Sequence, residues 1–130
     1  MIRVLFVDDE PNLLSGLRRM LRSMRAEWEM EFAEDPRQAL EMVSEGSFDV
    51  VVSDMRMPVM DGAELLEKIK AHDPGIARLI LSGQTDKEAA IRVSGTAHQF
   101  LSKPCDAEYL KFAIRRTCRL RSLMKDEDIR

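Results

Sequence analysis

The chain has 130 residues, the common size of a single domain, with 45% hydrophobic and 33% charged residues. This composition excludes a disordered chain, and the net charge of −3 argues against a protein built mainly to coat nucleic acid. No apolar run approaches the roughly 20 residues of a membrane-spanning helix, and the N-terminus lacks the pattern of a signal peptide. We therefore expect a cytoplasmic protein that binds neither nucleic acid directly nor a membrane.

In chain order, the first half of the sequence predicts two strands, each followed by a helix. The apolar run 4–7 predicts the first strand, and Pro11 is typical of the first position of a helix. The run 28–32 alternates apolar and polar residues, which predicts a strand with one polar face. Asp35 and Pro36 then cap and begin the second helix.

The second half repeats this pattern three times. Asp61 and Glu64 resemble a capping box at the start of the third helix. A fourth helix is expected at about 87–94, where the pattern is weak, and the last helix from near Asp106 to beyond Leu120. The predicted strands of this half are the apolar runs 50–52 and 79–81 and the short, more polar run 99–101.

Five strand–helix repeats predict an α/β fold, a doubly wound five-stranded parallel sheet with helices on both faces. The continuously apolar first, third and fourth strands are typical of strands that are buried on both faces. The alternating second strand and the short fifth strand suit the edges. The pattern therefore favours the flavodoxin-like strand order 2-1-3-4-5, in which ligands bind at the carboxyl ends of the strands.

Three carboxylates follow two strands that are neighbours in this order. Asp8 and Asp9 follow the first strand, and Asp54 follows the third. Crowding of like charges is costly unless a cation or a proton relieves it, and oxygen ligands suit Mg²⁺. Acidic residues after strands also serve as simple helix caps, but the three together favour a metal site.

Two further polar residues are expected at the same edge of the sheet. Lys103 follows the fifth strand and can reach back to the carboxylates, and Ser82 ends the fourth strand. Carboxylates, a hydroxyl and an ammonium suit phosphoryl transfer, which depends mostly on positioning and charge neutralisation. An aspartate can then serve as the covalent acceptor.

Several short motifs, in order and at matching spacing, resemble the receiver domains of two-component response regulators. The resemblance covers about residues 2–124. The motifs are Val-Asp-Asp-Glu at 7–10, Ser-Asp-Met-Arg-Met-Pro at 53–58, Met-Asp-Gly at 60–62, Leu-Ser-Gly at 81–83 and Phe-Leu-Ser-Lys-Pro at 100–104.

This resemblance implies roles for the acidic residues. Asp54 resembles the phosphoacceptor, which receives a phosphoryl group from a sensor histidine kinase or a phosphotransfer protein. Asp9 and Asp54 resemble direct Mg²⁺ ligands, together with the backbone carbonyl of Arg56. Asp8 resembles the partner that acts through metal-bound water.

The resemblance also implies a conformational switch. Lys103 resembles the phosphate-contacting lysine, which a cis bond usually joins to Pro104. Ser82 resembles the switch hydroxyl, and Phe100 the aromatic residue whose ring turns inward. The phosphoryl group is expected to change the surface of the fourth helix, fifth strand and fifth helix. Arg56 and Gln84 occupy positions that vary in the family and flank the path of attacking water, so the phosphate lifetime stays open.

The sequence of the last helix does not decide which partner the protein binds. Its basic residues are interpreted either as a solvated face or as a docking or dimerisation face. We expect a receiver domain at 1–124 and a C-terminal tail or linker stub at 125–130. The expected partners are an output domain beyond this chain or a second copy, bound through the switch surface.

Two other functions compete with this regulatory one, in which the chain catalyses only its own phosphorylation and dephosphorylation. An aspartate-nucleophile phosphohydrolase would usually carry a second acid where Arg56 stands. A pseudo-receiver would act only as an interaction module, which the complete set of acids, hydroxyl and lysine argues against. Cys105 and Cys118 form no metal-binding pair and are interpreted as small hydrophobic residues.

Overall fold

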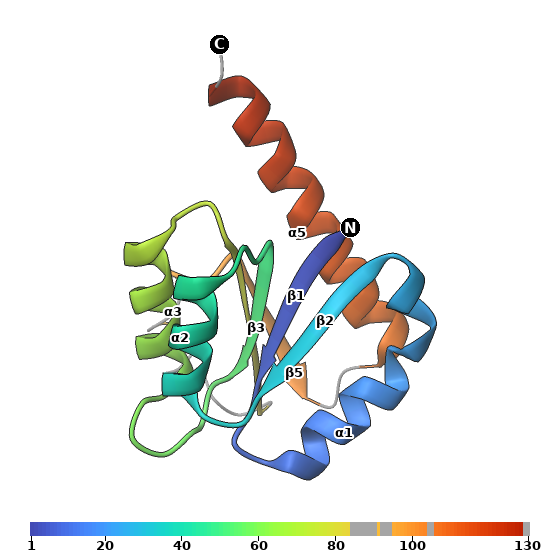
Figure 1. The fold of residues 1–130 in the computed structure, drawn as a ribbon, viewed down its shortest axis with the longest axis vertical. Helices are drawn as coiled ribbons and strands as arrows, with labels where there is room; N and C mark the ends of the chain where they lie inside the picture. Colours follow the sequence, from blue (N-terminus) through green and yellow to red (C-terminus); the bar gives the residue numbers. More distant parts are fainter. Residues whose placement is uncertain (84–90, 92–94, 104–105, 129–130) are drawn as a thin grey trace.

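The computed structural model describes residues 1–83, 91, 95–103 and 106–128, and their side chains as far as residue 120. Within these residues, five parallel strands form a sheet in the order β2-β1-β3-β4-β5 (Figure 1). This order confirms the predicted doubly wound α/β fold. The strands are β1 (Ile2–Val7), β2 (Trp28–Ala33), β3 (Val50–Asp54), β4 (Ala77–Gly83) and β5 (Gln99–Lys103).

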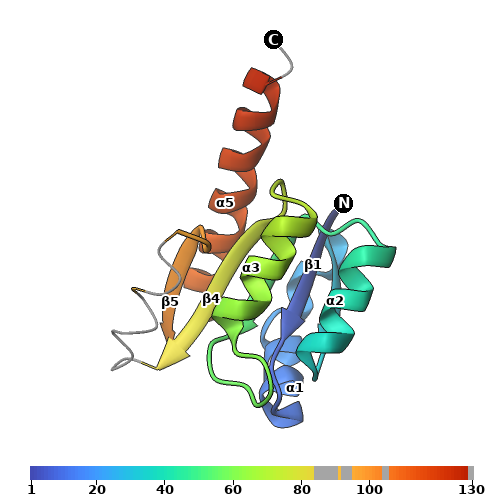
Figure 2. The same cartoon turned by 90° about the vertical axis from the view of Figure 1, so that its left-hand side faces the viewer.

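Helices cover both faces of the sheet. The first and last helices lie on one face, and the second and third on the other (Figures 1 and 2). The fourth helix, expected at about 87–94, lies outside the described residues except for Ile91, which is helical and exposed. The described helices are α1 (Pro11–Met20), α2 (Pro36–Glu45), α3 (Gly62–His72), α5 (Ala107–Asp128) and the 3-10 helix η1 (Arg22–Ala26).

The predicted helix starts are confirmed by their capping hydrogen bonds. The Asp35 carboxylate accepts a hydrogen bond from the backbone N–H of Arg37 at 2.8 Å. Asp61 accepts from the backbone N–H of Glu64 at 2.9 Å. Each cap satisfies an N–H group that has no partner within its helix. Because Asp61 caps α3, this helix begins directly after the loop that follows β3.

Two hydrophobic layers hold the helices on the sheet. Alternate residues of a strand point to opposite faces, so Val51 faces α2 and α3 whereas Val52 faces α1 and α5. All five residues of β3 are buried, as its continuous apolar run predicts. On the last helix, the residues that face the sheet are also buried, and they are Leu110, Ile114, Thr117 and Cys118.

The last helix, α5, is longer than the sheet that it covers. Its 22 residues correspond to a length of about 33 Å. The helix runs antiparallel to the strands and projects past the amino ends of the strands (Figures 1 and 2). The expected domain end at residue 124 falls inside this helix. None of the described helices combines the length and the apolar character needed to cross a membrane.

Candidate phosphoacceptor site

The candidate site lies where the carboxyl ends of four strands meet, at the lower end of the sheet in Figure 1. Asp8 follows β1, Asp54 is the last residue of β3, and Lys103 is the last residue of β5. The parallel register pairs Asp54 with Leu81 on β4. It also pairs Lys103 with Gly83 on the same strand. Parallel pairing thus brings together residues that are distant in sequence.

The three predicted carboxylates form one cluster. Oxygen atoms of Asp8, Asp9 and Asp54 all lie within 4.8 Å of one another. Asp8 is 4% exposed and Asp54 is 8% exposed, while Asp9 is half-buried. Such a cluster of oxygen donors at a partly open edge fits a hard divalent cation such as Mg²⁺, which takes few protein ligands.

Lys103 contacts two of these carboxylates. Its Nζ lies 2.6 Å from Oδ1 of Asp54 and 3.6 Å from Oδ2 of Asp8. Burial lowers the pKa of Lys103, but the hydrogen bond to Asp54 and the negative charges of Asp54 and Asp8 outweigh it and raise the pKa overall. The lysine is therefore a fixed cation at the predicted acceptor.

The charge of Asp8 is not fully compensated. Burial raises the pKa of Asp8, and the nearby negative charges of Asp54 and Asp9 act in the same direction. The backbone N–H of Glu10, which donates to Asp8 at 3.0 Å, and the positive charge of Lys103 oppose this shift. Because the net effect disfavours the carboxylate form, a bound cation would relieve the cluster.

The remaining predicted residues are placed as follows. Ser82 is buried near the end of β4, at the same edge as the acids. Phe100 on β5 is half-buried and packs against the core layer under α2 and α3. Arg56 is exposed in the loop after β3. Pro104 and Gln84 lie outside the described residues.

Sequence reasoning missed two residues that position the backbone of Asp54. The Ser53 hydroxyl, fully buried, donates to the backbone carbonyl of Asp54 at 2.9 Å. A Cβ atom at Gly62 would overlap this same carbonyl oxygen and lie 3.0 Å from Cα of Met55. Gly62 also donates its backbone N–H to the carbonyl of Met55 at 2.9 Å. The Met-Asp-Gly motif contains Gly62, but only the folded chain shows what the glycine touches.

The loop between β3 and α3 also contains a strained residue. Val59 has a φ of 71° and is 83% exposed. Positive φ is a genuine outlier for a β-branched residue and costs of order 1–3 kcal/mol. No signal in the sequence marks this position.

Comparison with known proteins identifies the family. The family model described as the response regulator receiver domain matches residues 4–115. This chain belongs to the response-regulator receiver family. All the motifs that resembled receiver domains lie within the matched range, and the receiver fold is the one predicted from the strand pattern.

The receiver has relatives among much longer regulators. It is 38% identical over 111 residues to the transcriptional regulatory protein ZraR of Escherichia coli. This match covers 85% of this chain and 25% of ZraR. It is 33% identical over 123 residues to the C4-dicarboxylate transport transcriptional regulatory protein DctD of Pseudomonas aeruginosa, covering 94% of this chain and 26% of DctD. The receiver therefore spans about a quarter of the length of these relatives.

Solved structures show the same fold. A response regulator receiver domain protein from Clostridium thermocellum matches with a TM-score of 0.87 and 31% identity, covering 95% of this chain and 99% of that chain. NtrX from Brucella abortus, solved in complex with ADP, matches with a TM-score of 0.89 and 26% identity. That match covers all of this receiver and 30% of the NtrX chain.

Proposed function

We propose that this receiver is a phosphoryl-accepting switch whose acceptor is Asp54. In the proposed reaction, an Asp54 carboxylate oxygen bonds to the phosphorus of a phosphohistidine on a sensor histidine kinase or phosphotransfer protein. The P–N bond breaks, and its electron pair stays on the imidazole. The observation that carries this proposal is the 2.6 Å contact between Asp54 and Lys103 inside the acidic cluster. Apart from consuming its phosphodonor, the chain would catalyse only its own phosphorylation and dephosphorylation.

Mg²⁺ is the proposed cofactor. Asp8, Asp9 and Asp54 would hold it, with the backbone carbonyl of Arg56 as a further ligand. When bound, the ion would offset the charge of the carboxylates and of the incoming phosphoryl group. The raised pKa of Asp8 supports this assignment, because burial and like charge disfavour the carboxylate form without such a cation.

The phosphoryl group would act as a signal through Lys103 and Ser82. Both side chains would bind its oxygens, and Phe100 would turn into the space that Ser82 leaves, with Pro104 setting the path of the chain after Lys103. The surface of residues 84–94, β5 and α5 would then change. Exposed apolar side chains at Ile91, Tyr109 and Phe112 support a contact role for this surface.

The proposed partners follow from this surface and from the relatives. A homodimer could form through it, or it could control an output domain beyond this chain. Residues 1–124 would form the receiver domain and residues 125–130 a tail or linker. The matched part of this chain covers only about a quarter of these relatives, which are named as transcriptional regulatory proteins. We place the receiver in the cytoplasm.

The test is intact mass after incubation with a small phosphodonor and Mg²⁺. We expect wild type to gain one phosphoryl group and Asp54→Ala to gain none, with no gain when Mg²⁺ is removed. Asp49→Asn, which changes a carboxylate at the opposite end of the sheet, is the matched control and should label normally. Labelling that persists in Asp54→Ala would contradict the proposal. If wild type does not label, binding of beryllofluoride would distinguish a short-lived phosphate from a pseudo-receiver.

A further inference from the structure

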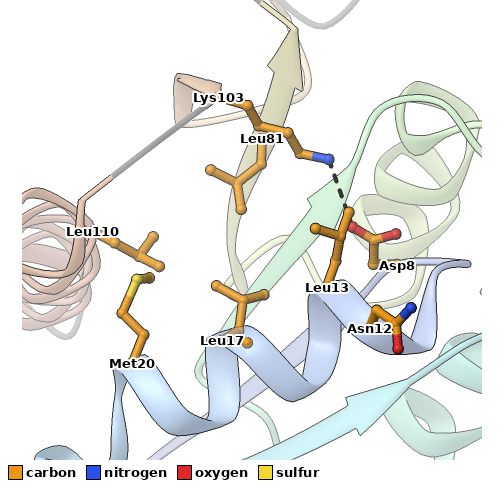
Figure 3. Close-up of a pocket in the computed structure, with 9 residues that line it drawn as sticks. Asp8, Asn12, Leu13, Leu17, Met20, Leu81, Lys103 and Leu110 are labelled. Atoms are coloured by element: carbon orange, nitrogen blue, oxygen red, sulfur yellow. Dashed lines mark ion pairs between the residues drawn. The ribbon is translucent and has the colours of Figure 1, made fainter.

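A groove with a volume of about 490 Å³ opens beside the acidic cluster, between α1 and α5 (Figure 3). Its volume lies within the range of small-molecule sites, roughly 300–1,000 Å³. Its polar residues are Asp8, Asn12 and Lys103. Most of its lining is apolar, and these residues are Leu13, Gly16, Leu17, Met20, Leu81 and Leu110.

The groove ends beside Lys103, the lysine that contacts the proposed acceptor. Lys103 lines it, and the Nζ of Lys103 lies 2.6 Å from Asp54 and 3.6 Å from Asp8. In Figure 3, Asp8 and Lys103 point toward each other at one end, while Met20 and Leu110 lie at the other end. A molecule with one anionic end at Lys103 would therefore lay its other end along apolar side chains.

This arrangement matches one class of phosphodonor. An acyl phosphate has an anionic phosphoryl group, which suits the Lys103 ammonium, and an acyl chain, which suits Leu17 and Met20. We propose that the groove makes this receiver select acyl phosphates with an apolar acyl chain over acetyl phosphate. The inference rests on the proposed function of Asp54 and names a substrate class for that site.

The reaction balances without another reactant. An Asp54 carboxylate oxygen forms a bond to phosphorus, and the bond from phosphorus to the acyl oxygen breaks. The electron pair of that bond leaves with the acyl carboxylate. Lys103 is placed to stabilise negative charge on the transferred group, and the leaving carboxylate departs along the groove.

The first experiment compares donors of increasing chain length. Rate constants for labelling would be measured by intact mass with acetyl, butyryl and hexanoyl phosphate at equal Mg²⁺. Because each buried methylene is favourable, we expect butyryl phosphate to label about tenfold faster than acetyl phosphate at subsaturating concentration. Equal rates for the three donors would overturn the proposal.

A groove-filling variant tests where the chain binds. A Cβ at Gly16 would meet no atom within 4 Å, so Gly16→Leu places its side chain in open groove space. We expect Gly16→Leu to reduce the butyryl-to-acetyl rate ratio to about one. Ser15→Leu adds the same side chain one residue away, outside the groove lining, and should keep the ratio of wild type. A ratio unchanged in Gly16→Leu would place the preference elsewhere and overturn the proposal.

A binding measurement separates this proposal from the proposed acceptor role. Alkylphosphonates carry a C–P bond and cannot transfer the phosphoryl group, so their affinity can be measured by calorimetry with Mg²⁺ present. We expect affinity to rise about tenfold from ethyl- to butylphosphonate and to lose this dependence in Gly16→Leu. If acetyl phosphate labels but chain length affects neither rate nor affinity, the groove proposal fails alone. A groove that receives apolar side chains of a partner protein would give that result.

If no donor labels Asp54 while alkylphosphonates still show the chain-length effect, the acceptor proposal fails and the groove remains a site for amphipathic anions.

Discussion

The two ends of the sheet treat charge in different ways. At the amino end, Arg3 has a full set of partners: its guanidinium contacts Glu31 at 2.8 Å and Glu29 at 3.1 Å, and it lies over the ring of Phe48. Its backbone N–H donates to Asp49 at 2.9 Å. These contacts join β1 to the neighbouring strand β2 and to the residues before β3.

A second cation of the amino end, Arg78, also has partners, although burial lowers its pKa. The buried Arg78 donates from Nε to the carbonyl of Thr96 at 2.7 Å and from Nη1 to that of Ile76 at 2.8 Å. At the carboxyl end, by contrast, Lys103 pairs with Asp54 and Asp8, and the pKa of Asp8 still stays raised. The difference is that the carboxyl end crowds three carboxylates around one cation, and a cluster of titratable groups with a perturbed pKa is typical of a ligand site. Three pairs of variants compare the two ends, and one pH dependence tests the carboxyl end.

The largest expected effect concerns two glycines at opposite ends. Gly62→Ala should lower the free energy of unfolding by about 3 kcal/mol, because its Cβ would meet the backbone of Asp54 and Met55. In Gly46→Ala, the nearest atom to the Cβ is the guanidinium Nη1 of Arg3, which is 3.0 Å away and can shift. That variant should lose well under 1 kcal/mol. Urea unfolding measures both losses, and equal losses would show that the backbone of Asp54 and Met55 shifts as easily as the Arg3 side chain.

The second-largest expected change in stability comes from removing the cation at each end of the sheet. Lys103→Met leaves buried carboxylates without their ammonium, so we expect a loss of about 2 kcal/mol in Mg²⁺-free buffer and substantial recovery on adding Mg²⁺. Arg3→Met should lose about 1 kcal/mol, and Mg²⁺ should not restore it. Thermal unfolding with and without Mg²⁺ distinguishes them. A Mg²⁺ response that is the same in both variants would remove the contrast.

Neutralising one carboxylate should change the free energy of unfolding in opposite directions at the two ends of the sheet. Asp8→Asn should stabilise the Mg²⁺-free protein by about 1 kcal/mol, because the raised pKa of Asp8 means that folding disfavours its charge. Asp49→Asn weakens the acceptor of the Arg3 backbone N–H and should destabilise the protein by a similar amount. Denaturant titration measures both changes in stability. A loss of stability in Asp8→Asn would show that Lys103 fully compensates the negative charge of Asp8.

The smallest expected effect is the pH dependence without Mg²⁺. Because the pKa of Asp8 is raised from 3.8, the folded protein binds this proton more tightly than the unfolded chain. Stability should therefore fall as pH rises from 3.8 through the raised pKa, and Asp8→Asn should abolish this fall. Because the pKa of Lys103 is raised from 10.5, its contribution is present below pH 10.5 and lost above it, as Lys103→Met should confirm. Urea unfolding across pH gives both profiles.

Most of the fold could be predicted because local patterns encode it. The apolar runs of β1, β3 and β4 indicate central strands, and the structure places all three inside the sheet. The caps at Asp35 and Asp61 need only neighbouring residues, so sequence spacing reveals them. The end of the first helix is less local: apolar residues at helical spacing continue in the sequence to Met24, but α1 ends at Met20 and Met24 lies in η1.

The candidate site was predictable in its residues but not in its contacts. By itself, the sequence determined the strand order and the residues at the carboxyl ends, because periodicity and topology depend on local chemistry. Only the tertiary structure decided that Lys103 lies 2.6 Å from Asp54, 49 residues away in sequence. The same holds for Gly62 against the acceptor carbonyl and for the groove between α1 and α5. These features depend on how separate elements pack, and no single segment contains the atoms that define them.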